Sequence, residues 1–159
     1  MASGPSEIIL LIAGLIVAAL VSGVLLETWD DMESALDDRG KEGAEDIRTR
    51  ASMVNDPSNV AWDNTEKTAT VYIQNSGETQ LNLEDIGVFI DTMPLTVSVA
   101  DSSTSWSPGQ IVQFTVDDTS DTLSYTGTND VIMTITVVSS ATGYAGAYTV
   151  SEEVRLVTS

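Results

Sequence analysis

The sequence predicts an α+β protein in which a long N-terminal helix is followed by an antiparallel, immunoglobulin-like β-sandwich. Three observations support this prediction: an apolar run near the N-terminus, helical spacing of apolar residues beyond it, and alternation of apolar and polar residues through the rest of the chain. They divide the 159 residues into a hydrophobic helix with an amphipathic stalk (1–54), a linker (55–64) and a β-sandwich head (65–159).

The apolar run covers residues 8–26, which are 19 consecutive uncharged residues. As a helix it spans about 28 Å, close to the roughly 30 Å hydrocarbon core of a bilayer. The alternative is a cleaved signal peptide, but no Lys or Arg precedes the run, and it exceeds the usual apolar length of about 7–15 residues. We therefore predict insertion into a membrane or into an equivalent hydrophobic bundle. The absence of basic residues near either end leaves the orientation open.

Small residues recur at intervals of four along this run, which places them in rows on the helix surface and permits close helix–helix approach in lipid. We expect self-association through this helix. The candidate membrane and assembly residues are Ile8, Leu11, Gly14, Leu15, Ala18, Ala19, Ser22, Gly23 and Leu26.

Beyond the apolar run, the chain is charged except for a narrow stripe of residues spaced by three and four. This pattern predicts that the helix continues as a stalk to about residue 54, because Pro57 disfavours helical geometry in Asp56. Gly40 and Gly43 weaken the helix and indicate a hinge. The stripe predicts a seam between subunits, formed by Trp29, Met32, Leu36, Ile47 and Val54.

After residue 64 the apolar residues alternate with polar ones, and turn-forming segments such as 75–77 and 107–109 separate the alternating runs. Six or seven short strands without an intervening helix are typical of an antiparallel sandwich. About 95 residues are enough to bury a core. No Cys pair is present, so an antibody-type domain is not implied.

The composition excludes several kinds of site. The chain has no Cys and no His, which excludes disulfides, thiol nucleophiles and the usual zinc, haem and Ser–His–Asp centres. Its net charge of −18 (24 acids, 6 bases) argues against nucleic acid as a partner. We predict no enzyme activity and no cofactor.

One acidic cluster offers oxygen ligands of the kind that calcium prefers, although the EF-hand spacing is absent. Against a calcium site, we favour a solvated acidic loop on an already acidic protein. The candidate ligands are Asp117, Asp118, Asp121 and Asp130, with Asn129 beside them.

Five segments, in order and spacing, resemble the archaeal flagellum (archaellum) accessory family FlaG. They are MASGPSEIILLIAGLIVAALVSGVL, SMVNDPSNVAWDN, TVYIQNSGETQL, GVFIDT and TSWSPGQIVQFTV. The resemblance covers residues 1–116 and leaves 117–159 unmatched.

The resemblance implies a static, stator-like component of the archaellum with type IV pilin-like architecture. It implies an anchor in the cytoplasmic membrane of an archaeon and a β head on the extracellular side. It also implies assembly with other copies into a homo-oligomer or filament through the N-terminal helix, and contact with the related F-type stator protein and the surface layer.

Two alternatives remain. The first is an archaeal type IV pilin or flagellin that forms a filament, although the short basic leader of such subunits is missing here and Gly4 is followed by Pro5. The second is a membrane-tethered adhesion or binding domain.

Overall fold

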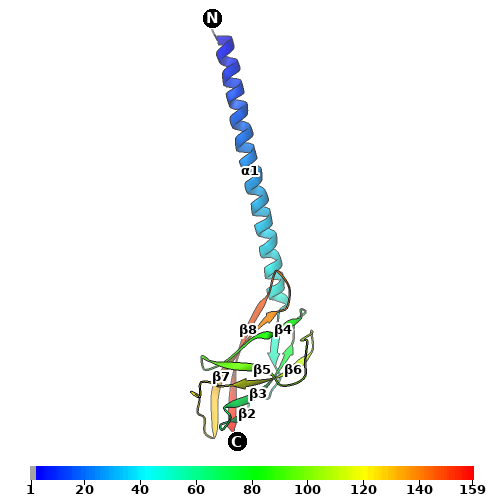
Figure 1. Cartoon of the computed structure of the whole chain (residues 1–159), viewed down its shortest axis with the longest axis vertical. Helices are drawn as coiled ribbons and strands as arrows, with labels where there is room; N and C mark the ends of the chain where they lie inside the picture. Colours follow the sequence, from blue (N-terminus) through cyan, green and yellow to red (C-terminus); the bar gives the residue numbers. More distant parts are fainter. Residues whose placement is uncertain (1–2) are drawn as a thin grey trace. The chain divides into compact units, whose positions relative to one another are not determined.

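The computed structural model describes residues 3–159 as one helix and eight strands. The elements are α1 (Ser3–Arg48), β1 (Ala51–Met53), β2 (Val60–Asp63), β3 (Thr68–Asn75), β4 (Leu81–Ile90), β5 (Met93–Val99), β6 (Ile111–Asp117), β7 (Thr128–Ser139) and β8 (Ala147–Thr158) (Figure 1). The chain divides at Gly40 into two compact units, which are described separately below. The predicted α+β class, a long N-terminal helix before a β-rich domain, is confirmed.

The helix ends at Arg48, earlier than the predicted residue 54. Ala51 and Val54 fit the helical spacing of the stalk, but they also fit the alternation of a strand. The strand is adopted because β1 pairs with the end of β3 and buries Ala51 to 4% exposure. A further strand, β2, lies inside the predicted linker, where Val60 and Trp62 alternate as fully buried residues.

The strands form a closed ring rather than the predicted two-sheet sandwich. Seven of them follow the order β3–β2–β8–β7–β4–β5–β6, and β6 pairs back onto β3 through the register Thr68↔Asp117 to Gln74↔Ile111. The eighth strand, β1, pairs with the C-terminal end of β3. The β2–β8 pair is parallel and the other pairs are antiparallel. The domain is therefore a seven-stranded barrel, and the immunoglobulin-like prediction is corrected.

The two longest strands, β7 and β8, lie in the part of the chain that the family resemblance did not reach. They pair without interruption from Thr128↔Val157 to Val138↔Ala147. Cross-strand hydroxyl pairs add to this ladder on the outer face, with Thr134–Ser151 oxygens 2.8 Å apart and Thr136–Thr149 oxygens 3.0 Å apart.

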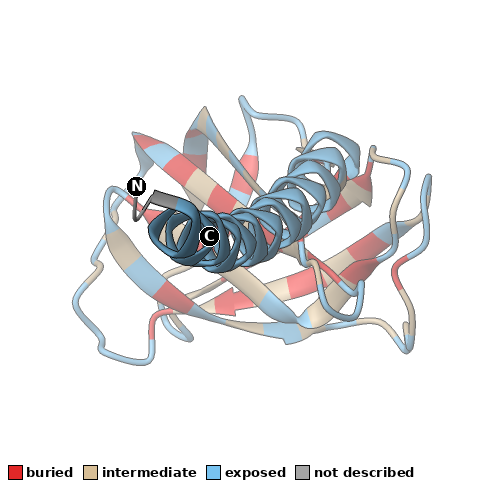
Figure 2. Cartoon of the chain, turned by 90° about the horizontal axis from the view of Figure 1, so that it is seen from above, coloured by how far each residue is buried: buried red, intermediate tan, exposed pale blue. Residues whose placement is uncertain are grey.

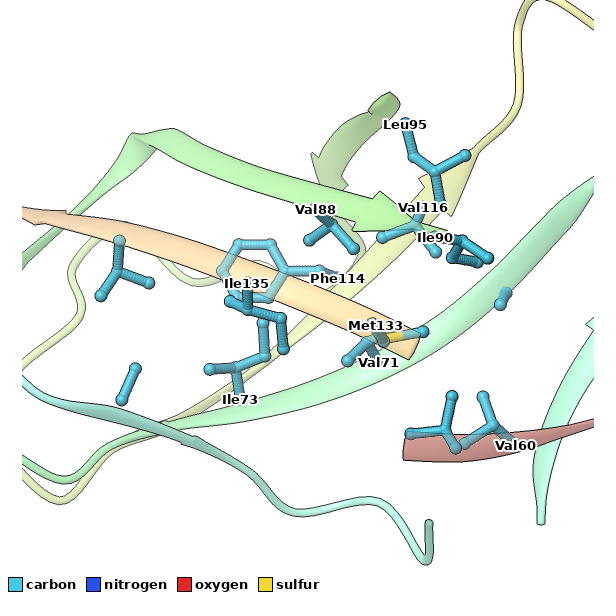
Figure 3. Close-up of a cluster of buried hydrophobic side chains, with 14 of the residues drawn as sticks. Val60, Val71, Ile73, Val88, Ile90, Leu95, Phe114, Val116, Met133 and Ile135 are labelled. Carbon is cyan, nitrogen blue, oxygen red and sulfur yellow. The ribbon is translucent and has the colours of Figure 1, made fainter. Parts of the chain in front are cut away.

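Inward-facing side chains from all around the ring fill the barrel. Figure 2 shows the resulting alternation of buried and exposed residues along the strands, and Figure 3 shows Phe114, Met133 and Ile135 among the side chains that converge between them. Trp106 packs on Phe114 with ring centroids 5.1 Å apart, and Trp62 meets Tyr125 edge-on at 5.6 Å. The barrel is thus packed solid with apolar side chains.

Candidate assembly surfaces on the helix and the barrel

The apolar part of α1 is not covered by any described part of the chain. Thirteen large apolar side chains between Ile8 and Leu26 are each more than half exposed. Removing such a side chain from water stabilises by roughly 1–2 kcal/mol, which makes on the order of 20 kcal/mol for the set. A surface of this kind requires lipid or other apolar helices around it.

By length and composition this helix could cross a membrane. Its most apolar stretch of 18 residues has a mean hydropathy of 3.0, and none of that stretch is buried. Thr28, just beyond it, donates its hydroxyl hydrogen to the carbonyl oxygen of Val24 at 2.9 Å. That bond satisfies the Thr28 hydroxyl within the helix itself.

The small residues and the stalk stripe lie on one side of α1. At 100° per residue, the positions of Gly14, Ala18, Ser22, Trp29, Met32 and Leu36 fall within a sector of about 80°. An added Cβ at Gly14 would meet nothing within 4 Å inside the chain, so the small side chain is not required by packing within the molecule. The larger members of the stripe, Trp29, Met32 and Leu36, are 66%, 54% and 64% exposed. The two predicted surfaces are therefore one continuous face along the helix.

The remaining predicted assembly residues occupy different places. Ile8, Leu11, Leu15 and Leu26 are exposed on the same apolar segment, and Ala19 and Gly23 form a second small row next to the first. Ile47 lies on the last turn of α1 and is 71% exposed. Val54 is not on the helix: its amide donates to the carbonyl oxygen of Tyr72, which places it on the barrel wall beside β3.

The last turns of α1 belong to the barrel unit and are held by the start of β8 and by the loop before β4. The amide of Ala147 donates to Oδ1 of Asp46 at 2.9 Å, and the amide of Glu78 donates to the carbonyl oxygen of Arg48 at 2.9 Å. The final carbonyls of a helix have no partner within the helix, and the amide of Glu78 supplies one to the carbonyl of Arg48. The helix end is thereby fixed to the barrel.

Two glycines allow this close approach. A Cβ on Gly146 would lie 2.5 Å from Oγ1 of Thr49 and 2.6 Å from the backbone of Glu45, and a Cβ on Gly77 would collide with the backbone of Arg48. Two cations also lie over tyrosine rings, Lys41 at 5.6 Å from the ring centre of Tyr144 and Arg50 at 4.8 Å from that of Tyr148. This junction was not foreseen in the sequence, where Gly77 indicated only a turn.

The predicted hinge lies just before this junction. A Cβ at Gly40 or Gly43 would meet nothing within 4 Å, so neither glycine serves a close contact within the molecule. Gly40 is also where the two compact units divide. The hinge remains a prediction.

The acidic residues weighed as calcium ligands do not come together as a cage. Asp118 is 3% exposed, and its carboxylate accepts hydrogen bonds from Ser120 and from the amides of Thr122 and Leu123 at 2.6–3.2 Å. Burial acts to raise the pKa of Asp118, but these hydrogen bonds outweigh it and the net pKa is lowered. Hydrogen-bond donors thus occupy the oxygens that a cation needs, and the residue organises a turn.

The other acids of this cluster, Asp117, Asp121 and Asp130, lie beside different neighbours. Asp121 lies 3.8 Å from the ammonium of Lys67 and is largely exposed. Asp130 accepts two hydrogen bonds from Arg155 at 2.7 and 3.1 Å, and this interaction lowers the pKa of Asp130. Asp117 lies at the end of β6, opposite Thr68 and Thr96, and Asn129 binds the carbonyl of Thr126. Within residues 3–159, no three acidic side chains are placed to hold a metal ion.

An uncovered apolar helix joined to a packed β-barrel defines a class of structural subunit that is anchored or assembled through its N-terminal helix. The chain belongs to the archaeal-type flagellin family, whose model matches residues 2–157. Members of this family are structural proteins of the archaeal flagellum rather than enzymes. The match reaches residue 157, so β7 and nearly all of β8 are part of the family's domain.

Two relatives carry the provisional name flagella-related protein G. The one from Methanococcus voltae is 32% identical over 95 residues, which span 58% of this chain and 63% of the relative. The one from Methanocaldococcus jannaschii is 25% identical over 122 residues, which span 72% of this chain and 79% of the relative. The matched region thus covers just under two-thirds of the Methanococcus voltae protein. The resemblance to the FlaG type of archaellum protein is confirmed.

Proposed function

We propose that this chain is a static structural element of the archaellum, held in the cytoplasmic membrane by α1 with its barrel on the extracellular side. The single observation that carries the proposal is the uncovered apolar surface between Ile8 and Leu26. In lipid, or in a bundle of like helices, that surface is covered. The continuous face from Gly14 to Leu36 is the proposed contact between copies.

A rotating filament needs a fixed element that resists its torque. The junction between the last turns of α1 and the barrel supports such a role, because hydrogen bonds and close backbone contacts around Asp46 and Arg48 join the two directly. A force applied to the barrel is thereby passed to the helix end. By analogy with the FlaG family, the barrel is the part that would contact the F-type stator protein and the surface layer.

A second candidate function is that of a filament subunit, a flagellin or type IV pilin. The observation that favours it is the match of the archaeal-type flagellin model over almost the whole chain. A helix-assembled filament also covers the apolar surface of α1. The two candidates differ in what is lost when the protein is removed.

Deletion of the gene in the native archaeon, followed by electron microscopy and swimming assays, separates the candidates. The stator proposal predicts cells that keep flagellar filaments but do not swim. Loss of the main filament itself would instead assign the chain as a flagellin. Unchanged swimming would contradict both. Complementation with the wild-type gene is the control, and it must restore swimming.

A further inference from the structure

The outer face of the barrel carries a hollow of about 590 Å³ over β4 and β7, which we call the β7 groove. It is lined by Phe89, Asp91, Thr92, Ile132 and Thr134. The side chain of Ile132 is 54% exposed, and that of Phe89, which lies opposite Thr134, is half-buried. A hollow with an apolar floor and a few polar groups at its edge is the usual form of a binding site.

The turn between β4 and β5 fixes the edge of the groove. Asp91 and Thr92 both have positive φ there, 46° and 77°. The amide of Asp91 donates to the carbonyl oxygen of Ile132, and Oδ1 of Asp91 accepts from the amide of Ile132, both at 2.9 Å. The other carboxylate oxygen of Asp91, Oδ2, accepts no hydrogen bond from the residues that the structure describes. It is therefore available to a ligand in the groove.

A second carboxylate lies beside the groove. Glu153 on β8 is directly opposite Ile132 and exposed on the same outer face, where opposite Cβ atoms are about 4.5–5.5 Å apart. Within residues 3–159, its side chain accepts no hydrogen bond. The nearby Arg155 already donates to Asp130 at 2.7 and 3.1 Å. Three carboxylates (Asp91, Asp130 and Glu153) and one guanidinium thus give this region a net charge of −2.

These groups favour a cation on an apolar stem as the ligand. An arginine side chain fits best, because its stem can cover Ile132 while its planar guanidinium lies on the ring of Phe89 and donates to Asp91 and Glu153. An anion would be repelled by the same carboxylates. A divalent metal ion needs about six or more oxygen ligands, which two carboxylates beside an apolar floor do not provide.

A second copy of this chain does not offer such a group from its barrel wall. The chain has six bases, of which two lie over tyrosine rings and two are paired with carboxylates: Lys41, Arg50, Lys67 and Arg155. The other two, Arg39 and Arg48, lie on α1. A net charge of −18 also repels an identical molecule and attracts a basic one. Both facts favour a different, basic protein as the partner.

We propose that the β7 groove binds an arginine-bearing segment of a second, basic protein. The arginine stem lies on Ile132, and its guanidinium lies between Phe89, Asp91 and Glu153. Arginine is enriched among the few residues that dominate binding at protein interfaces. The inference goes beyond the proposed function, because it concerns the barrel alone and holds for a stator and for a filament subunit.

A pair of short peptides tests the ligand chemistry. The probe is the capped peptide Gly-Leu-Arg-Leu-Gly, and its control carries citrulline, an uncharged group of the same shape, in place of the arginine. Binding to the full-length protein in phosphatidylcholine nanodiscs is followed through the δ1 methyl signal of Ile132. We expect the arginine peptide to bind at least about tenfold more tightly. Equal binding of both peptides, or no binding at millimolar peptide, would overturn the proposal.

A pair of double variants tests the site. Asp91→Asn/Glu153→Gln removes both charges, and Asn keeps the acceptor for the Ile132 amide and tolerates positive φ. The matched control, Glu84→Gln/Asp85→Asn, removes the same charge from exposed acids toward the other end of β4. Thermal melting confirms that each variant is folded.

The groove variant should bind the arginine peptide about tenfold more weakly than the parent. At about 0.15 M salt, charges more than about 8 Å away are largely screened, so the control should stay within about twofold. Equal weakening in both variants would show attraction to the overall charge and overturn the site. If Asp91→Asn unfolds the turn, Glu153→Gln alone carries the test, with Glu84→Gln as its control. Either failure leaves the proposed function standing, because membrane anchoring does not depend on the groove.

Discussion

Gly146→Ala is expected to detach the end of α1 from the barrel. The new methyl group would lie 2.5 Å from Oγ1 of Thr49 and 2.6 Å from the carbonyl carbon and oxygen of Glu45. Both the helix backbone and the hydroxyl it binds would have to move. Overpacking of this kind costs about 1–3 kcal/mol.

The junction can relieve this overpacking by opening. The cost of the added methyl group therefore cannot exceed the free energy of the junction contacts that break. The bonds from Ala147 to Asp46, from Glu78 to Arg48 and from Ser76 to Arg50 join the barrel to the helix end and the residues after it. Each stabilises by about 0.5–1.5 kcal/mol. The overpacking cost and the free energy of these three hydrogen bonds overlap in range. We therefore expect the opening equilibrium of the junction to shift by about 1–3 kcal/mol, or roughly five- to 150-fold.

Hydrogen exchange of the full-length protein in detergent measures this shift directly. The amides of Thr49, Ser76 and Glu78 should exchange roughly five- to 150-fold faster in Gly146→Ala, while amides in β7 remain protected. Gly43→Ala is the matched control, because its Cβ meets nothing within 4 Å and the change stabilises the helix by up to about 1 kcal/mol. Equal protection of the junction in Gly146→Ala and the parent would refute the docking described here.

Three further predictions concern the acidic turn and the helix. Asp118→Ala should destabilise the barrel by about 2–4 kcal/mol in urea unfolding, because it leaves the part-buried amides of Thr122 and Leu123 unpaired. The exposed Asp121→Asn, whose side chain tolerates the positive φ of 51° at this position, should cost under about 0.5 kcal/mol. Because the pKa of Asp118 is lowered, its ionised form stabilises the fold above its unfolded pKa. The difference in free energy of unfolding between the parent and Asp118→Ala should therefore be full at pH 7 and shrink as the pH falls below about 4. A difference that does not change with pH would contradict the role given to the Asp118 carboxylate. Millimolar calcium should leave the melting temperature unchanged, and a rise of several degrees would restore the calcium hypothesis. Gly14→Leu should weaken self-association in membranes, measured by energy transfer between labelled copies, while Ile16→Leu on another face of α1 should not; equal association of both would remove the small-residue face from the account.

Much of the fold could be predicted from local pattern. The apolar run from Ile8 to Leu26 admits only a helix that is covered by lipid or other helices. The strict alternation in 112–116 and 131–137 corresponds to β6 and β7, whose inward residues are buried. These features depend on residue spacing alone, which is why the sequence reveals them.

The closure of the barrel could not be predicted in the same way. Alternation is the same for the inside of a sandwich and the inside of a barrel. The difference lies in long-range pairing, here β3 with β6 and β2 in parallel with β8. The fate of Val54 shows the same limit, since its spacing fits both the helical stripe and a strand, and only the partner Tyr72 decides.

Some of the candidate sites could be predicted from the sequence and others could not. Exposure of Trp29, Met32 and Leu36 follows from their place on a charged helix, and was predictable. The saturation of Asp118 by local donors was not, because a cluster of acids in sequence does not reveal which way the oxygens face. Nor could the junction be foreseen, because Gly146 and Glu45 are about a hundred residues apart in the chain.

The claim on which the account depends is that the apolar helix remains part of the working protein and is covered by lipid or by other helices. The most direct test is the intact mass of the native protein recovered from carbonate-washed archaeal membranes. The account predicts a membrane-retained species whose mass includes residues 8–26. A mature chain that lacks this segment, or an intact chain released as a soluble monomer, would contradict it.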